Sequence, residues 1–172
     1  MANELADAGK FEMALPIITK GVAENQGDVQ LVQTLFNVLG ALKQTKRMTQ
    51  VGEEMVRMDT SLATQDYFDR MISAYAVDSQ FQKATETASR ATAKFSKVAA
   101  NWLTRGNLER RIGQNQQSVE SLKRALVLDP KTPGARQIII NSFVDQEQYD
   151  SAFVAIHEAW KSWAAHQGMS GS

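Results

Sequence analysis

The side chains that could take part in chemistry are few and scattered. The chain contains two histidines, His157 and His166, and no cysteine. Asp66 and Asp69 are three residues apart, a spacing that places both carboxylates on one face of a helix, where a general acid and base could lie. A metal site needs several converging ligands, and no carboxylates are patterned beside either histidine. We therefore expect all four side chains to be solvated helix positions.

The sequence also lacks the loops that bind phosphates and the motifs that activate a nucleophile. No glycine-rich Walker or Rossmann loop and no serine of a nucleophile elbow occurs. These absences predict a non-catalytic protein with no cofactor and no metal. The 19 basic and 19 acidic residues balance, which argues against nucleic acid as a partner because phosphate binding requires a surplus of Lys and Arg.

Hydropathy gives no sign of a membrane protein. No run of about 18 apolar residues occurs, so the sequence predicts no transmembrane span. The first ten residues lack the basic region and apolar stretch of a signal peptide. The sequence leaves the location unknown: the cytoplasm, or the periplasm if a leader has been removed.

Apolar and small residues return at three- and four-residue spacing along the chain, which predicts helices throughout. The same pattern repeats every 34 residues. Three columns of this register are Phe68, Trp102 and Arg136, then Tyr75, Glu109 and Phe143, then Ala84, Ser118 and Ala152. Self-similarity at this period is typical of stacked helix–turn–helix repeats.

The clearest repeat consists of two amphipathic segments, 99–112 and 114–127, with Gly113 between them. Pro130 closes the repeat because proline cannot continue a helix. This stretch resembles a tetratricopeptide repeat. The residues at that family's spacings are Trp102, Gly106, Gly113, Ala125, Leu126 and Pro130. The resemblance implies an all-α, right-handed superhelical α-solenoid of antiparallel helix pairs.

The register predicts one repeat domain over residues 1–166 and a flexible tail at 167–172. The expected units are a partial repeat at 1–28 and repeats at about 32–64, 65–98, 99–132 and 133–166. Apolar columns in the second unit lie 33 residues before the third, and those in the first lie 37 before the second. We therefore expect one residue lost near Thr60, about three gained near Asn25, and a chain cut from a longer array.

The resemblance also implies a binding surface, since the first helix of each pair lines a concave groove that holds extended peptides or partner proteins. Asn107 and Asn141 occupy equivalent slots, and an amide can both donate to and accept from a peptide backbone. Arg110 and Arg111 could bind a carboxylate or phosphate, or pair within the chain. The candidate groove residues are Asn37, Lys43, Asp69, Arg70, Ser73, Asn107, Arg110, Arg111, Gln137, Asn141 and Asp145.

Other roles remain open. Trp163 faces the place where a further repeat would stack, so the chain could form homo-oligomers through this end. It could also be a regulatory or targeting domain of a larger enzyme or of a secretion or assembly machine. Trp160 shares a slot with Leu126 and is expected in the core. Arg105 and Glu109 occupy slots that are usually apolar, so we expect their stems to pack with the charges in water, or the slots to be exposed.

Overall fold

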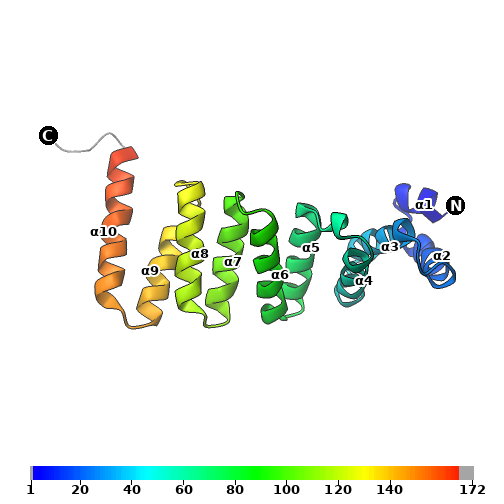
Figure 1. Ribbon diagram of the computed structural model, residues 1–172, viewed down its shortest axis with the longest axis horizontal. Helices are drawn as coiled ribbons and strands as arrows, with labels where there is room; N and C mark the ends of the chain where they lie inside the picture. Colours follow the sequence, from blue (N-terminus) through cyan, green and yellow to red (C-terminus); the bar gives the residue numbers. More distant parts are fainter. Residues whose placement is uncertain (1, 167–172) are drawn as a thin grey trace. The chain divides into compact units, whose positions relative to one another are not determined.

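The computed structural model describes residues 2–166, and all of the regular structure in this part of the chain is helical (Figure 1). The predicted tail at 167–172 lies outside the described residues. The helices are α1 (Ala2–Asp7), α2 (Phe11–Glu24), α3 (Val29–Ala41), α4 (Thr45–Met58), α5 (Gln65–Val77), α6 (Phe81–Lys94), α7 (Ala99–Arg111), α8 (Asn115–Leu128), α9 (Ala135–Asp145) and α10 (Tyr149–His166), with the 3-10 turn η1 (Thr60–Leu62) between α4 and α5.

The chain divides into an N-terminal unit, Met1–Thr87, and a C-terminal unit, Ala88–Ser172, with the boundary inside α6. In the N-terminal unit α1 packs on α2, α2 on α3, α3 on α4 and α4 on α5. In the C-terminal unit α7 packs on α8, α8 on α9 and α9 on α10. Short turns between neighbouring helices make the pairs antiparallel, as α7 and α8 show in Figure 1.

The two helices of each pair are joined by the same tight turn. One turn residue has a positive φ: Gly9 (72°), Lys43 (55°), Ser79 (57°), Gly113 (81°) or Glu147 (57°). The N–H of the following residue donates to a carbonyl five positions back, as Gln114 does to Glu109 at 2.8 Å. This is the Schellman ending of a helix. Four of the five turns continue with a glutamine: Gln44, Gln80, Gln114 and Gln148.

These turns correct the predicted register in the N-terminal unit. Lys43 and Ser79 are 36 positions apart, so the second repeat gains two residues relative to the 34-residue period rather than losing one. Gly9 and Lys43 are 34 apart rather than 37. The expected alignment was wrong because residues three apart share a helix face, so matching apolar positions tolerates a slip of one turn.

Small residues let the helices of the C-terminal unit approach closely, and Gly106 is the clearest case. A Cβ at this position would lie 2.7 Å from Cγ of Leu122. The Ser118 hydroxyl donates to the Gly106 carbonyl at 2.7 Å, which ties α8 to α7. Leu122, fully buried, forms the core of this unit with Val119, Ala135 and Ile139. The close packing of α7 and α8 therefore requires a residue without a side chain at position 106.

Two expectations about the core are wrong. The Glu109 carboxylate does not reach water: the residue is 2% exposed and pairs with Arg105. This core position can hold a carboxylate because Arg105 and Ser121 bind its two oxygens. Trp160 is not a core residue, since 61% of it is exposed. The helix that would cover it in a further repeat is not among the described elements.

Candidate binding surface

Short polar side chains occupy the same position on the first helices of four successive pairs, two pairs in each unit, and we call this set of four residues the polar row. With the register taken from the turns, Asn37, Ser73, Asn107 and Asn141 occupy equivalent positions, each seven residues before the glutamine of its turn. Asn141 is half-buried and the other three are exposed. The sequence analysis assigned equivalent positions only to Asn107 and Asn141. Its register for the N-terminal unit was three residues off, so Asn37 was assigned to a different position of the repeat. The turn glutamines were the signal that could have placed it.

In the N-terminal unit, Arg70 of α5 is held against α3. Its Nη1 donates to Oδ1 of Asn37 at 2.7 Å, and its guanidinium lies 4.3 Å from the centre of the Phe36 ring. Asp66 lies 3.6 Å from Nη1. A Cβ at Gly40 would collide with Nη2 of Arg70, so this glycine makes room for the guanidinium. Arg70 is thus fixed in one orientation. Its hydrogen bond to Asn37 uses only the side-chain oxygen of that residue.

The other predicted groove residues of this unit lie in different settings. Asp69 and Ser73 are exposed on α5, and Oδ1 of Asp69 accepts a bond from Nε2 of Gln65 at 2.9 Å. Lys43 is exposed in the turn that follows α3. The structure therefore brings Asn37 and Arg70 together and places Lys43 beyond the end of the helix.

In the C-terminal unit, an ion pair connects the ends of two first helices. Nε and Nη2 of Arg110 on α7 lie 3.0 and 2.7 Å from Oδ2 of Asp145 on α9. Their side chains are 37% and 44% exposed. Of the two roles left open for Arg110, the structure shows the pair within the chain. Arg111 is exposed at the end of α7.

The two asparagines of this unit are partly engaged by their own helices. Nδ2 of Asn107 donates to the backbone carbonyl of Leu103 at 3.1 Å, and the side-chain oxygen of Asn107 takes no part in that bond. Oδ1 of Asn141 accepts from Nε2 of Gln137 at 3.0 Å. Each amide is thereby steered by one local bond and keeps further hydrogen-bonding capacity.

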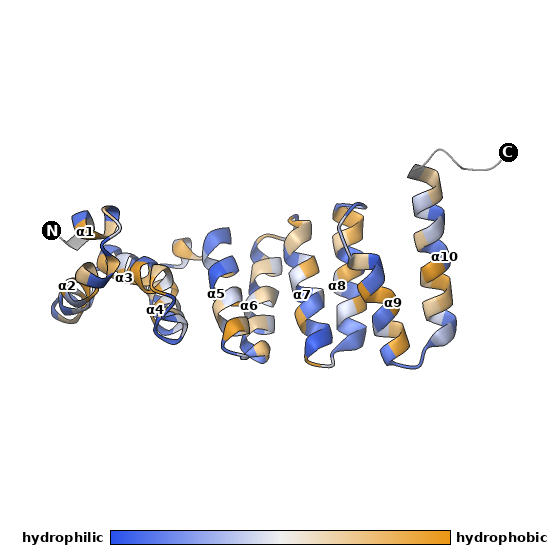
Figure 2. Ribbon diagram, turned by 180° about the vertical axis from the view of Figure 1, so that it is seen from behind, coloured by the Kyte–Doolittle hydropathy of each residue, from blue (hydrophilic) through white to orange (hydrophobic). Residues whose placement is uncertain are grey.

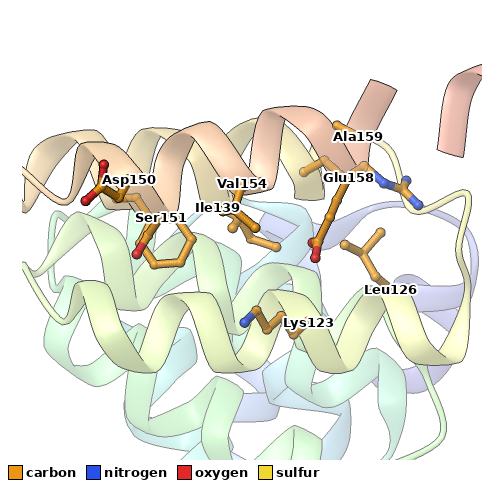
Figure 3. Close-up of a pocket in the computed structure, with 11 residues that line it drawn as sticks. Lys123, Leu126, Ile139, Asp150, Ser151, Val154, Glu158 and Ala159 are labelled. Atoms are coloured by element: carbon orange, nitrogen blue, oxygen red, sulfur yellow. The ribbon is translucent and has the colours of Figure 1, made fainter. Parts of the chain in front are cut away.

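The C-terminal unit also contains a cavity of about 370 Å³ between α8, α9 and α10 (Figure 3). Its apolar lining comes from Leu126, Ile139, Phe143 and Val154, and charged side chains surround it: Lys123, Arg136, Asp150 and Glu158. None of the predicted groove residues lines it. This cavity could not be predicted from the sequence, because it depends on how α10 lies against α8 and α9.

The described residues contain neither a cluster that could bind a metal ion nor a helix that could span a membrane. Among residues 2–166, no three His, Asp or Glu side chains converge in a way that could hold a metal ion. In the same part of the chain, every helix is too short or too polar to cross a bilayer. The pKa of Asp59 is lowered by hydrogen bonds from the side chain and backbone of Ser61 in the α4–α5 connection.

Solved structures share this fold at low sequence identity. A crystal structure of MamA aligns with a TM-score of 0.70 and 16% identity, covering 98% of this chain and 97% of that one. A MamA fragment from Desulfovibrio magneticus RS-1 gives 0.67 and 15% over 99% and 93%. The crystal structure of YrrB, described as a TPR protein with an unusual peptide-binding site, gives 0.72 and 16% over 96% and 84%.

No curated protein sequence matches the chain. A family model described as tetratricopeptide repeat matches residues 42–171. The helical structure and these neighbours confirm the predicted all-α solenoid of antiparallel helix pairs. The chain belongs to the tetratricopeptide-repeat family.

Proposed function

We propose that this chain is a non-catalytic scaffold that binds an extended peptide, or an extended segment of a partner protein, along its first helices. The observation that carries the proposal is the equivalent placement of asparagines on the first helices of each unit: Asn37 in the N-terminal unit, and Asn107 and Asn141 in the C-terminal unit. An amide offers both a donor and an acceptor, as does each residue of a peptide backbone. Such contacts hold the main chain whatever its side chains are.

The spacing of Asn107 and Asn141 suits an extended ligand. Packed helices lie about 10 Å apart, and an extended chain advances about 3.3 Å per residue. Asn107 and Asn141 lie on α7 and α9, which are in contact. One asparagine would therefore meet the peptide backbone at roughly every third residue.

The charged neighbours would then supply selectivity. Arg70 is fixed by Asn37 and the Phe36 ring, so it presents an ordered cation at low entropic cost. Arg110 is already paired with Asp145, and a ligand carboxylate would have to displace that aspartate. Arg70 therefore favours peptides with an acidic residue near the first-helix surface of the N-terminal unit. YrrB, whose structure is described as containing a peptide-binding site, gives a precedent in the same fold.

The test is a selection of peptides from a random library on the wild-type chain, followed by affinity measurement on variants. Asn107→Ala/Asn141→Ala should weaken binding of the selected peptides about 10- to 100-fold, because each hydrogen bond contributes about 1 kcal/mol. A matched control is Gln116→Ala/Gln117→Ala, which removes two exposed amides from the second helix α8. Equal affinity of both variants for the selected peptides would contradict the proposal.

A further inference from the structure

Five large apolar side chains form an exposed line along α10. They are Tyr149, Phe153, Ile156, Trp160 and Trp163, which are 64%, 72%, 50%, 61% and 54% exposed. Their separations are four, three, four and three residues, the spacing of the seam along which two helices pair. We call this set the α10 stripe. Figure 2 shows the hydrophobic stretch along the middle of this helix.

The inner face of α10 carries small residues instead. Ala152 is buried, Ala155 packs against the core of the C-terminal unit, and Ala159 is half-buried. An amphipathic surface helix normally turns its large apolar side chains toward the core. Here the helix docks through alanines and leaves its aromatic side chains in water, so the stripe is available for a contact outside the chain.

The area of the stripe is sufficient for a specific contact between two copies. An aromatic side chain can bury about 150–250 Å², and each of these is more than half exposed. The stripe therefore offers roughly 500 Å² per copy. Such a patch is at the upper end for a monomer's surface, and two of them together reach the roughly 1,000 Å² that a specific interface needs.

The charges beside the stripe select the occupant and its direction. Asp150 and Lys161 are both exposed and lie at nearly equal distances on either side of Ile156. In an antiparallel pair centred on Ile156, the Asp150 of each copy is level with the Lys161 of the other. In a parallel pair, like charges would lie beside each other and the two helix dipoles would be aligned, and both arrangements are repulsive. We propose that α10 is a self-association surface, through which two copies pair antiparallel along the stripe.

The first test is sedimentation velocity of the full chain from low micromolar to near-millimolar concentration. We expect a reversible monomer–dimer equilibrium, with Trp emission shifting to shorter wavelength as Trp160 and Trp163 leave water. Phe153→Glu/Trp160→Glu should weaken dimerisation at least about a hundredfold, because central aromatic residues dominate such interfaces. The matched control is Val127→Glu on α8, which is 71% exposed and outside the stripe, and it should dimerise like the wild type.

The second test concerns direction. Asp150→Lys alone should weaken dimerisation about tenfold, and Asp150→Lys/Lys161→Asp should restore it. Circular dichroism of each variant checks that the helices remain folded. A wild-type chain that stays monomeric at near-millimolar concentration, an equal loss in Val127→Glu, or charge variants that all associate alike would each overturn the proposal. Asn107→Ala/Asn141→Ala should dimerise normally, so this result is independent of peptide binding.

Discussion

Arg105 and Glu109 form an ion pair inside the C-terminal unit, with Nε and Oε1 2.7 Å apart. The carboxylate is also bound by the Ser121 hydroxyl, which donates to Oε2 at 2.7 Å. Nη1 of Arg105 donates to the hydroxyl of Thr92 at 3.2 Å. The pair therefore connects α6, α7 and α8, and its hydrogen-bond partners satisfy both charges. The positions equivalent to Glu109 in the neighbouring repeats hold the aromatic residues Tyr75 and Phe143.

Removing one member of this pair should cost far more than removing both. Arg105→Met leaves a carboxylate buried without its cation, and we expect the free energy of unfolding to fall by about 3 kcal/mol. Arg105→Met/Glu109→Leu should recover most of that loss, because an apolar pair needs no compensating charge. Urea denaturation followed by circular dichroism measures both. A double variant as unstable as the single one would show that the pair stabilises through packing instead.

Gly106 should tolerate no side chain. Gly106→Ala places a Cβ 2.7 Å from Cγ of Leu122 and 3.2 Å from the carbonyl of Ser118. We expect a loss of about 1–3 kcal/mol in the free energy of unfolding, the usual cost of overpacking. Gly27→Ala is the control, since no atom lies within 4 Å of a Cβ there. Equal melting temperatures for the two variants would contradict this explanation of the helix contact.

Removing a glycine from one turn and adding one to another should change the stability in opposite directions. Ser79 and Gly113 have equivalent positions and similar conformations, with φ of 57° and 81°. Gly113→Ala should destabilise the chain by about 1 kcal/mol, and Ser79→Gly should stabilise it by a few tenths or more. Thermal unfolding of the two variants provides the comparison. A change of the same sign in both would mean that the turn conformation is not what limits stability.

The Arg110–Asp145 pair should contribute little to stability. Both side chains are more than a third exposed, so a double-mutant cycle with Arg110→Ala and Asp145→Ala should give a coupling below about 1 kcal/mol. The coupling should shrink further in high salt, since exposed charges are screened. A large, salt-independent coupling would instead indicate a structural clamp between α7 and α9, and would argue against Arg110 as a site where ligands compete.

Much of the fold could be predicted from the sequence, because helical periodicity and the 34-residue register are local patterns. The clearest case is the C-terminal unit, where Gly106 and Gly113 have the positions that the pattern assigns. The register of the N-terminal unit could not be fixed by apolar columns, since a shift of three residues keeps a side chain on the same face. The geometry that repeats from pair to pair lies in the turns, and three of the five turns use Lys43, Ser79 or Glu147 where a glycine is expected.

The binding surface was predictable only in outline. The polar row could be placed from Asn107 and Asn141, but the partners of Arg70 and Arg110 depend on contacts between helices that are more than 30 residues apart in the chain. The burial of Glu109 and the exposure of Trp160 have the same origin. Each depends on which neighbouring helix is present and on the groups it offers, and the apolar pattern of a single helix contains neither fact.

The turn that joins each helix pair has a constant length, whereas the connections between pairs do not. The segments 25–28 and 95–98 have four residues, and 59–64 and 129–134 have six. The helical hairpins thus share one turn length, and the linkers between hairpins absorb the differences in length. Insertions and deletions should be tolerated between hairpins and rejected within them, so an engineer could lengthen this protein at Thr60 or Lys131 without changing any of the turns.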